Sequence, residues 1–162
     1  MPDAQEKSDA LLRIINIIDD ALSQVSQRAA GGSLKVNLKS AELEVKVVRR
    51  KGASAGGELP FLPVELSGKH KRSEVQTFIL SMIPRRGTER FGKEAEELAD
   101  SIIAMARTID TMRRNMPNWK TETFTIVAQV EIEKEGGFKV VVGGEGHRGS
   151  AHTIKLLFEP EP

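Results

Sequence analysis

The sequence predicts an α+β protein in which one unit occurs twice in tandem. Two observations lead to this prediction. A helix-like stretch followed by three strand-like stretches occurs in each half of the chain. In addition, residues 68–84 align without a gap on residues 144–160, with identical glycine, arginine, threonine, leucine and proline positions. We therefore expect a first helix–meander repeat over residues 1–86 and a second over residues 87–162.

The first predicted helix runs from about residue 5 to residue 28 and ends at Gly31-Gly32. Apolar residues recur along it at alternating steps of four and three, which is typical of an amphipathic helix. This stripe consists of Leu11, Ile15, Ile18, Leu22 and Val25. Further apolar residues at Leu12, Ile14 and Ile17 widen it, so this helix is predicted to have a second contact surface.

The second predicted helix covers about residues 88–115, with Thr88 as the expected N-cap and Met116-Pro117 as the stop. Its apolar stripe is regular, as in helices that lie along another helix. The stripe consists of Ala95, Leu98, Ile102, Met105, Ile109, Met112 and Met116. The first helix is the expected partner, and Trp119 is expected to cover the end of the second.

The sequence predicts the strands of the second unit more clearly than those of the first. Apolar and polar residues alternate over residues 124–133, a glycine turn leads into residues 138–142, and residues 152–158 complete a three-stranded antiparallel meander. The first unit has the same order at residues 43–47, 63–66 and 75–83. Residues 34–38 alternate out of phase with residues 43–47, which predicts a bulge at about Lys39-Ser40.

A unit of about 75 residues is near the lower limit of independent stability, so the halves are expected to form one fused globular unit. We expect the helices to pack on the sheet and on each other, with the halves related by a pseudo-two-fold axis. One continuous six-stranded sheet with both helices on one face is favoured over two three-stranded sheets with the helices between them.

The composition excludes several classes of protein. Lysine and arginine number 24 against 23 acids, so the chain has no strong overall positive electrostatic field that would attract nucleic acid or an anionic membrane. The chain has no cysteine, hence no disulfide, thiolate nucleophile or cysteine-bound metal. No apolar run approaches the ~20 residues of a membrane span. A cytoplasmic protein is expected, with no membrane partner, and nucleic acid is disfavoured as a partner.

The second unit also resembles a known family. Its helix at residues 95–114, the strand at 124–133, and the Gly-Gly turn, valine-rich strand and small-residue loop of residues 136–160 resemble the second type of trypsin-co-occurring domain. Residues 94–160 carry the stronger resemblance and residues 8–84 a looser one. The resemblance implies a non-catalytic adaptor in bacterial conflict or peptidase-linked signalling systems. It also implies a protein partner such as a peptidase or NTPase encoded nearby.

The residues themselves offer no catalyst. The glycine-rich stretch 143–149 lacks the Gly-Lys-Ser/Thr and the following helix of a phosphate-binding loop. His147 and His152 lack the spacing of metal ligands, and they are interpreted as surface or loop histidines. Ser73 and Ser150 have histidines near them in sequence only. We therefore expect no enzymatic activity, no cofactor and no metal.

Arg72 and Arg148 occupy corresponding loop positions in the two units. The simpler interpretation is that each packs along a strand and pairs with a nearby acid. The alternative is an anion, nucleotide or nucleic-acid sensing module that uses these basic loops. Its candidate binding residues are Lys69, His70, Lys71, Arg72, His147, Arg148 and His152. The favoured hypothesis is a protein–protein interaction module that docks a partner or a second copy of itself through the helix pair or an exposed strand edge.

Overall fold

The computed structural model describes residues 4–31, 34–49, 61–64, 72–85, 92–132, 138–141 and 152–161. Helix α1 (Ala4–Gly31) is followed by β1 (Val36–Arg49), β2 (Phe61–Pro63), the short 3-10 helix η1 (Arg72–Glu74) and β3 (Val75–Met82). Helix α2 (Lys93–Arg114) is followed by β4 (Phe124–Ile132), β5 (Phe138–Val141) and β6 (His152–Pro160). The predicted order of one helix and three strands in each half is thus observed.

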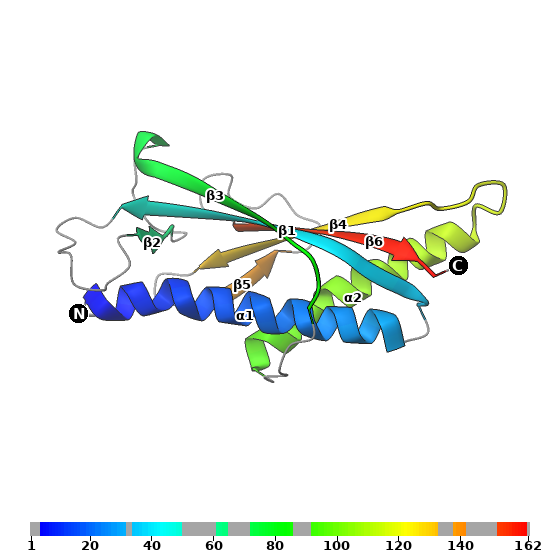
Figure 1. The fold of residues 1–162 in the computed structure, drawn as a ribbon, viewed down its shortest axis with the longest axis horizontal. Helices are drawn as coiled ribbons and strands as arrows, with labels where there is room; N and C mark the ends of the chain where they lie inside the picture. The colour runs from blue at the N-terminus through cyan, green and yellow to red at the C-terminus, as the bar shows by residue number, and fades with distance from the viewer. Residues whose placement is uncertain are drawn as a thin grey trace.

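The strands form one antiparallel six-stranded sheet, which confirms the favoured arrangement. Strands β2, β1, β6, β4 and β5 follow one another across it, and β3 pairs with β1 as well. Figure 1 shows both helices on the same side of this sheet. The α+β class is therefore confirmed.

The strands within each half do not form the predicted meander. The first strand lies in the middle and pairs with both others, because β1 pairs with β2 and β3, and β4 pairs with β5 and β6. Gln76 and His152 correspond in the repeat alignment, and they lie opposite Val47 of β1 and Val130 of β4, respectively. A common origin of the halves remains a prediction.

The two halves join through β1 and β6. If a two-fold axis related the halves, it would exchange β1 with β4 and β6 with β3. The pairing of β1 with β6 would then require an equivalent pairing of β4 with β3, but the described part of β3 pairs only with β1. The sheet junction therefore lacks the predicted pseudo-two-fold symmetry. The predicted bulge is confirmed, because the β1–β6 register shifts between Leu38 and Ser40. The bulge brings the alternation of buried and exposed residues back into phase, so the apolar side chains before and after the bulge are buried on the same face of the sheet.

The core lies between the helices and one face of the sheet. Strands β1, β4 and β6 contribute alternate apolar side chains, including Ile126, Ile154 and Phe158, of which Ile154 and Phe158 are fully buried. The ring of Phe124 stacks on that of Phe158, with centroids 5.0 Å apart. Each buried aliphatic side chain contributes about 1.5–3 kcal/mol, so this layer is the main source of stability.

The predicted helix stripes are largely correct. In α1, Leu11, Ile18 and Val25 are buried, but Ile14 takes the core position expected for Ile15, which is 40% exposed. The predicted second surface of α1 is its packing against α2. In α2 the stripe is buried from Ala95 to Ile102, Met105 and Ile109 are partly buried, and Met112 and Met116 are exposed.

The start of α2 depends on a residue of α1. The N-cap of α2 is Gly92 rather than Thr88, which lies outside the described residues, and glycine has no side chain to cap the helix. A carboxylate oxygen of the buried Asp20 accepts the Gly92 N–H at 3.1 Å instead. Arg13 also forms an ion pair with Glu94 at 3.0 Å. The Asp20 carboxylate thus links α1 to the start of α2, where a negative charge is favoured by the positive end of the helix dipole.

Replacing Asp20 with alanine is expected to lower the free energy of unfolding by about 1–2 kcal/mol, because a helix N-terminus loses its acceptor. Asp20→Asn keeps an acceptor oxygen, so it should lose less than half of that amount. Urea denaturation at neutral pH measures both. Equal losses in the two variants would contradict this role for the carboxylate oxygen.

Candidate functional site

Most of the predicted polar site lies outside the described residues. This holds for Lys69, His70, Lys71, His147 and Arg148. Arg72 begins η1, but its side chain also lies outside the described part of the chain. The anion-binding prediction for these loops therefore remains a prediction.

His152 is placed differently from its interpretation as a surface or loop histidine. It is the first residue of β6 and is 0% exposed. Its Nδ1 accepts the backbone N–H of Lys46 at 3.1 Å, and its Nε2 lies 3.2 Å from the carbonyl oxygen of Val64. Since Nδ1 accepts, Nε2 carries the proton and donates to Val64. Both nitrogens are used within the fold, so His152 is not free to bind a ligand.

This imidazole closes a gap in the sheet. Both β6 and β2 lie along β1, and the Val64 N–H donates to the Lys46 carbonyl at 3.0 Å just beyond the end of β6. The His152 ring bonds Lys46 and Val64 at this point. Burial lowers the pKa of His152 from 6.5 to about 4; the Val64 hydrogen bond opposes this shift and the positive charge of Lys46 adds to it.

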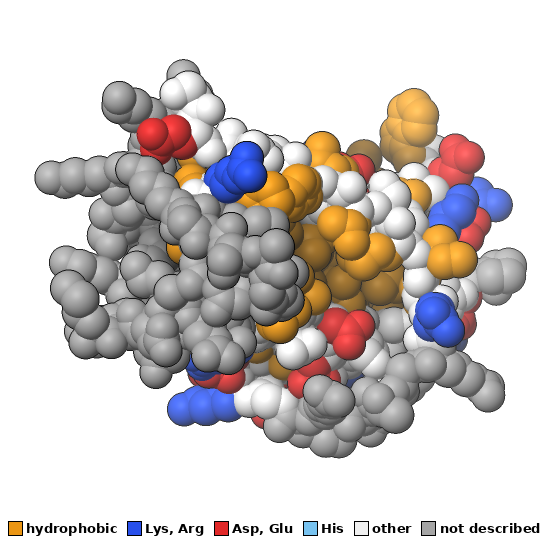
Figure 2. All heavy atoms as spheres, turned by 60° about the vertical axis from the view of Figure 1, so that its left-hand side comes forward, with side chains coloured by type: hydrophobic (Ala, Val, Ile, Leu, Met, Phe, Trp, Pro, Cys, Tyr) orange, Lys and Arg blue, Asp and Glu red, His pale blue; other side chains and the backbone are white. Residues whose placement is uncertain are grey.

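A first exposed apolar surface lies between α1 and β3. We define the α1–β3 surface as Ile15, Phe78, Leu80 and Ile83, which are between 40% and 76% exposed. Ile79, which is 59% exposed, lies opposite Glu44 on the other face of β3. A cavity of about 350 Å³ opens among Ile15, Phe78, Leu80 and Met82, with core residues of α1 and β1 as its floor. Figure 2 agrees, since apolar side chains line a hollow near the centre of the face that it shows. Large exposed patches of this kind mark interaction sites.

The backbone of β3 adds to this surface. Within the described part of the chain β3 pairs only with β1, so its other edge presents unpaired N–H and C=O groups. Phe78 contacts Phe61 of β2 edge to face at 5.1 Å between centroids, yet it remains 40% exposed. The surface thus combines apolar side chains with an open strand edge.

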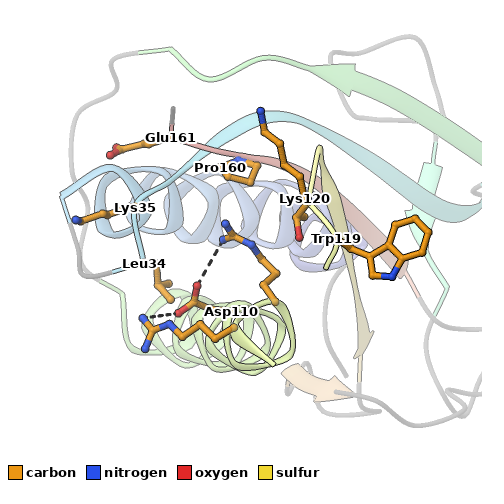
Figure 3. Close-up of a pocket in the computed structure, with 10 residues that line it drawn as sticks. Leu34, Lys35, Asp110, Trp119, Lys120, Pro160 and Glu161 are labelled. Carbon is orange, nitrogen blue, oxygen red and sulfur yellow. Dashed lines mark hydrogen bonds and ion pairs between the residues drawn. The ribbon is translucent and has the colours of Figure 1, made fainter. Parts of the chain in front are cut away.

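A second exposed apolar surface lies at the C-terminal end of α2. We define the α2-end patch as Met112, Met116 and Trp119, which are 57%, 51% and 76% exposed. Trp119 does not cover the helix end as expected; Figure 3 shows its ring directed away from the Asp110 cluster. The Trp119 N–H donates to the Met116 carbonyl, which holds the turn against the helix.

A polar cavity of about 620 Å³ lies beside this patch (Figure 3). Asp110 pairs with both Arg113 and Arg114, at 3.5 and 2.8 Å. Lys35, Lys120 and Glu161 complete its charged lining. Since Asp110 already neutralises the two arginines in part, the cavity is only weakly basic.

The part of the chain that the structure describes holds no group of three or more histidine, aspartate or glutamate side chains placed to bind a metal. No helix in the described ranges has the length and apolar character needed to cross a membrane.

Residues 10–84 match the family model described as Trypsin-co-occurring domain 2. The match runs from α1 through β3, so it supports the predicted family for the half in which the looser resemblance was expected. A trypsin-co-occurring domain 2 indicates an accessory module of peptidase-associated systems. No curated protein and no solved structure matches the chain.

The sequence signals for the two apolar surfaces were present but only partly recognised. In the half that matches the family model, β3 carries three adjacent large apolar residues, Phe78, Ile79 and Leu80, which exceeds what a strand with one buried face needs. In the other half, the α2 stripe continues to Met116, beyond the sheet that could cover it. In both places the sequence has more apolar residues than the core can bury, which indicates exposed apolar surface.

His152 predicts a pH dependence of stability. Its pKa in the folded protein lies below the unfolded value, so the unfolded state binds more protons and stability is lost as the pH falls from 6.5 toward 4. The loss is about 3 kcal/mol at 1.36 kcal/mol per pKa unit. Urea denaturation of the wild type and of His152→Gln between pH 7 and 4 isolates this contribution. Parallel curves for the two proteins would contradict it.

Proposed function

We propose that this protein is a non-catalytic adaptor that brings proteins together in a peptidase-associated system. The observation that carries the proposal is that one sheet-and-helix fold presents two separate exposed apolar surfaces. These are the α1–β3 surface and the α2-end patch. An adaptor requires two such surfaces, because it has to contact two proteins at once.

The proposed partner at the α2-end patch is a trypsin-like peptidase encoded beside this chain. The family match supports a peptidase-associated role. Tryptophan is among the residues that contribute most to protein interfaces, and methionine adapts to irregular hollows. Trp119 with Met112 and Met116 therefore suits a hollow on a partner surface.

The proposal includes no chemical step and no cofactor. It places the protein within a bacterial conflict or signalling system, as the family resemblance implies, and in the cytoplasm, with which the cysteine-free composition is compatible. The alternative, an anion, nucleotide or nucleic-acid sensor, depends on Arg72, Arg148 and the residues near them. The described part of the chain adds no observation in its favour.

Isothermal titration calorimetry with the adjacent peptidase tests the adaptor function. Wild-type protein should bind saturably, and Trp119→Ala should raise Kd by about tenfold or more, as expected for a central interface residue. Val127→Ala is the matched control, because Val127 is 45% exposed on β4 but belongs to neither surface. A wild type that does not bind the peptidase would contradict the function. Unchanged binding by Trp119→Ala would exclude the α2-end patch as the contact.

A further inference from the structure

We infer that a second copy of this chain occupies the α1–β3 surface. The two β3 strands pair antiparallel about a two-fold axis through Ile79 and join two six-stranded sheets into one. This inference extends the proposed function, since it names the partner at one of the two surfaces. It rests on the direction of the free backbone groups, on the sequence of β3 and on the exposure of its side chains.

The backbone direction fixes which residues would bond across the axis. The N–H and C=O of Lys46 both point away from β3, toward His152 and Val64. Alternate residues of a strand point to opposite edges, so Val45 and Leu43 bond the β3 residues Phe78 and Leu80 that lie opposite them. The intervening β3 residues, Thr77, Ile79 and Ser81, therefore direct their N–H and C=O groups to the free edge.

The sequence of β3 is chemically symmetric about Ile79. Each residue before Ile79 resembles the residue at the same distance after it. Moving outward from Ile79, the two members of each pair are large and apolar, then carry hydroxyl groups, then are long and unbranched, and then are β-branched and aliphatic. The pairs are Phe78/Leu80, Thr77/Ser81, Gln76/Met82 and Val75/Ile83. When two copies pair antiparallel about Ile79, every residue lies opposite its chemical counterpart. This self-complementarity favours a second copy over an unrelated strand.

The edge lacks the usual protection against pairing. Exposed edge strands commonly carry lysine, proline or a bulge that blocks another strand. Strand β3 has eight residues, none charged and none proline, and its register with β1 is continuous from Val75 to Met82. Two such edges meet without like-charge repulsion.

The second half of the chain shows what covers an equivalent strand. Strand β6 corresponds to β3, and β1 pairs along its outer edge. Its core-facing residues Ile154, Leu156 and Phe158 are 0% exposed. The corresponding residues Phe78 and Leu80 are 40% and 49% exposed because no strand and helix lie beyond β3 in the described chain.

The proposed pairing supplies this missing cover. The strands β1 of the two copies would lie three strand spacings apart, about 14 Å. The α1 helices of the two copies would then flank the hollow from both sides, with Ile15 of each facing Phe78 and Leu80. The apolar surface that is exposed in one chain becomes the centre of the dimer core.

Multi-angle light scattering after size exclusion measures the assembly. Wild-type protein at about 100 μM should have twice the mass of the chain, as expected for any Kd well below that concentration. Ile79→Lys should reduce it to the single-chain mass, because two lysines would face each other on the axis. Glu44 lies opposite Ile79 within the same chain, so the new lysine has a favourable neighbour and the fold should persist. Circular dichroism checks this.

Val127→Glu is the matched control. Val127 is an exposed strand residue on β4 and lies opposite Lys155, so it too gains an oppositely charged neighbour. This variant should remain a dimer. A wild type with the single-chain mass, or a dimer that Ile79→Lys leaves intact, would overturn the inference.

Cysteine cross-linking tests the register independently of any destabilised variant. The chain has no cysteine, so Ile79→Cys introduces a single thiol. Residues in a hydrogen-bonded antiparallel pair have Cα atoms about 5.5 Å apart, which a disulfide can span. Mild oxidation should give a covalent dimer of Ile79→Cys and none of Val127→Cys. Absence of the covalent dimer under conditions where the thiol is oxidisable would count against pairing at Ile79.

The outcomes separate the inference from the proposed function. A monomeric wild type that binds the adjacent peptidase would leave the adaptor function in place and refute the β3 dimer. A β3 dimer that does not bind the peptidase would support the dimer and refute the peptidase-binding function.

Discussion

The pairing of β1 with β6 is the interaction on which the structure depends. Without it, each half would be one helix over three strands, with an apolar sheet face too wide for that helix to cover. The junction places both sheets edge to edge, and both helices then share one continuous apolar face. The bulge at Leu38–Ser40 keeps the apolar side chains of β1 on that face on both sides of it. On the outer face, Glu42 lies opposite Lys155, a cross-strand arrangement that favours this register.

The junction also explains why His152 is buried. Strand β1 is longer than β6, so the β1 edge beyond β6 has to be completed by another group. Strand β2 completes part of it, and the His152 imidazole bonds the backbone between the two strands. A histidine suits this position because one ring nitrogen accepts while the other donates. The burial that makes the ring useful here also lowers its pKa, so sheet integrity and protonation are linked.

Local sequence patterns predicted the elements well, including the bulge, since periodicity and turn residues are properties of neighbouring residues. They did not predict which strands pair. Strand β1 lies in the middle of its half because both of its edges are used, and that depends on contacts between residues such as Leu43 and Ile154, which are far apart in sequence. The cap of α2 was missed for the same reason, because Asp20 belongs to the other helix. Residue type and spacing in the sequence predict candidate polar residues, but neither property shows that a histidine such as His152 is enclosed by two other strands.

The two halves share one pairing order but differ in how they are covered, and this difference is the most informative feature for function. In the second half the third strand is enclosed by β1 and by both helices, so its apolar face contributes to stability. In the first half the third strand keeps similar apolar residues, Phe78 and Leu80, where the described chain leaves them exposed. Exposed apolar side chains on an open edge raise the risk of aggregation and add little to the stability of a single chain. Their presence on an unprotected strand is therefore best explained by an interface, and the chemical symmetry of β3 about Ile79 indicates that the interface is with the same strand of another chain.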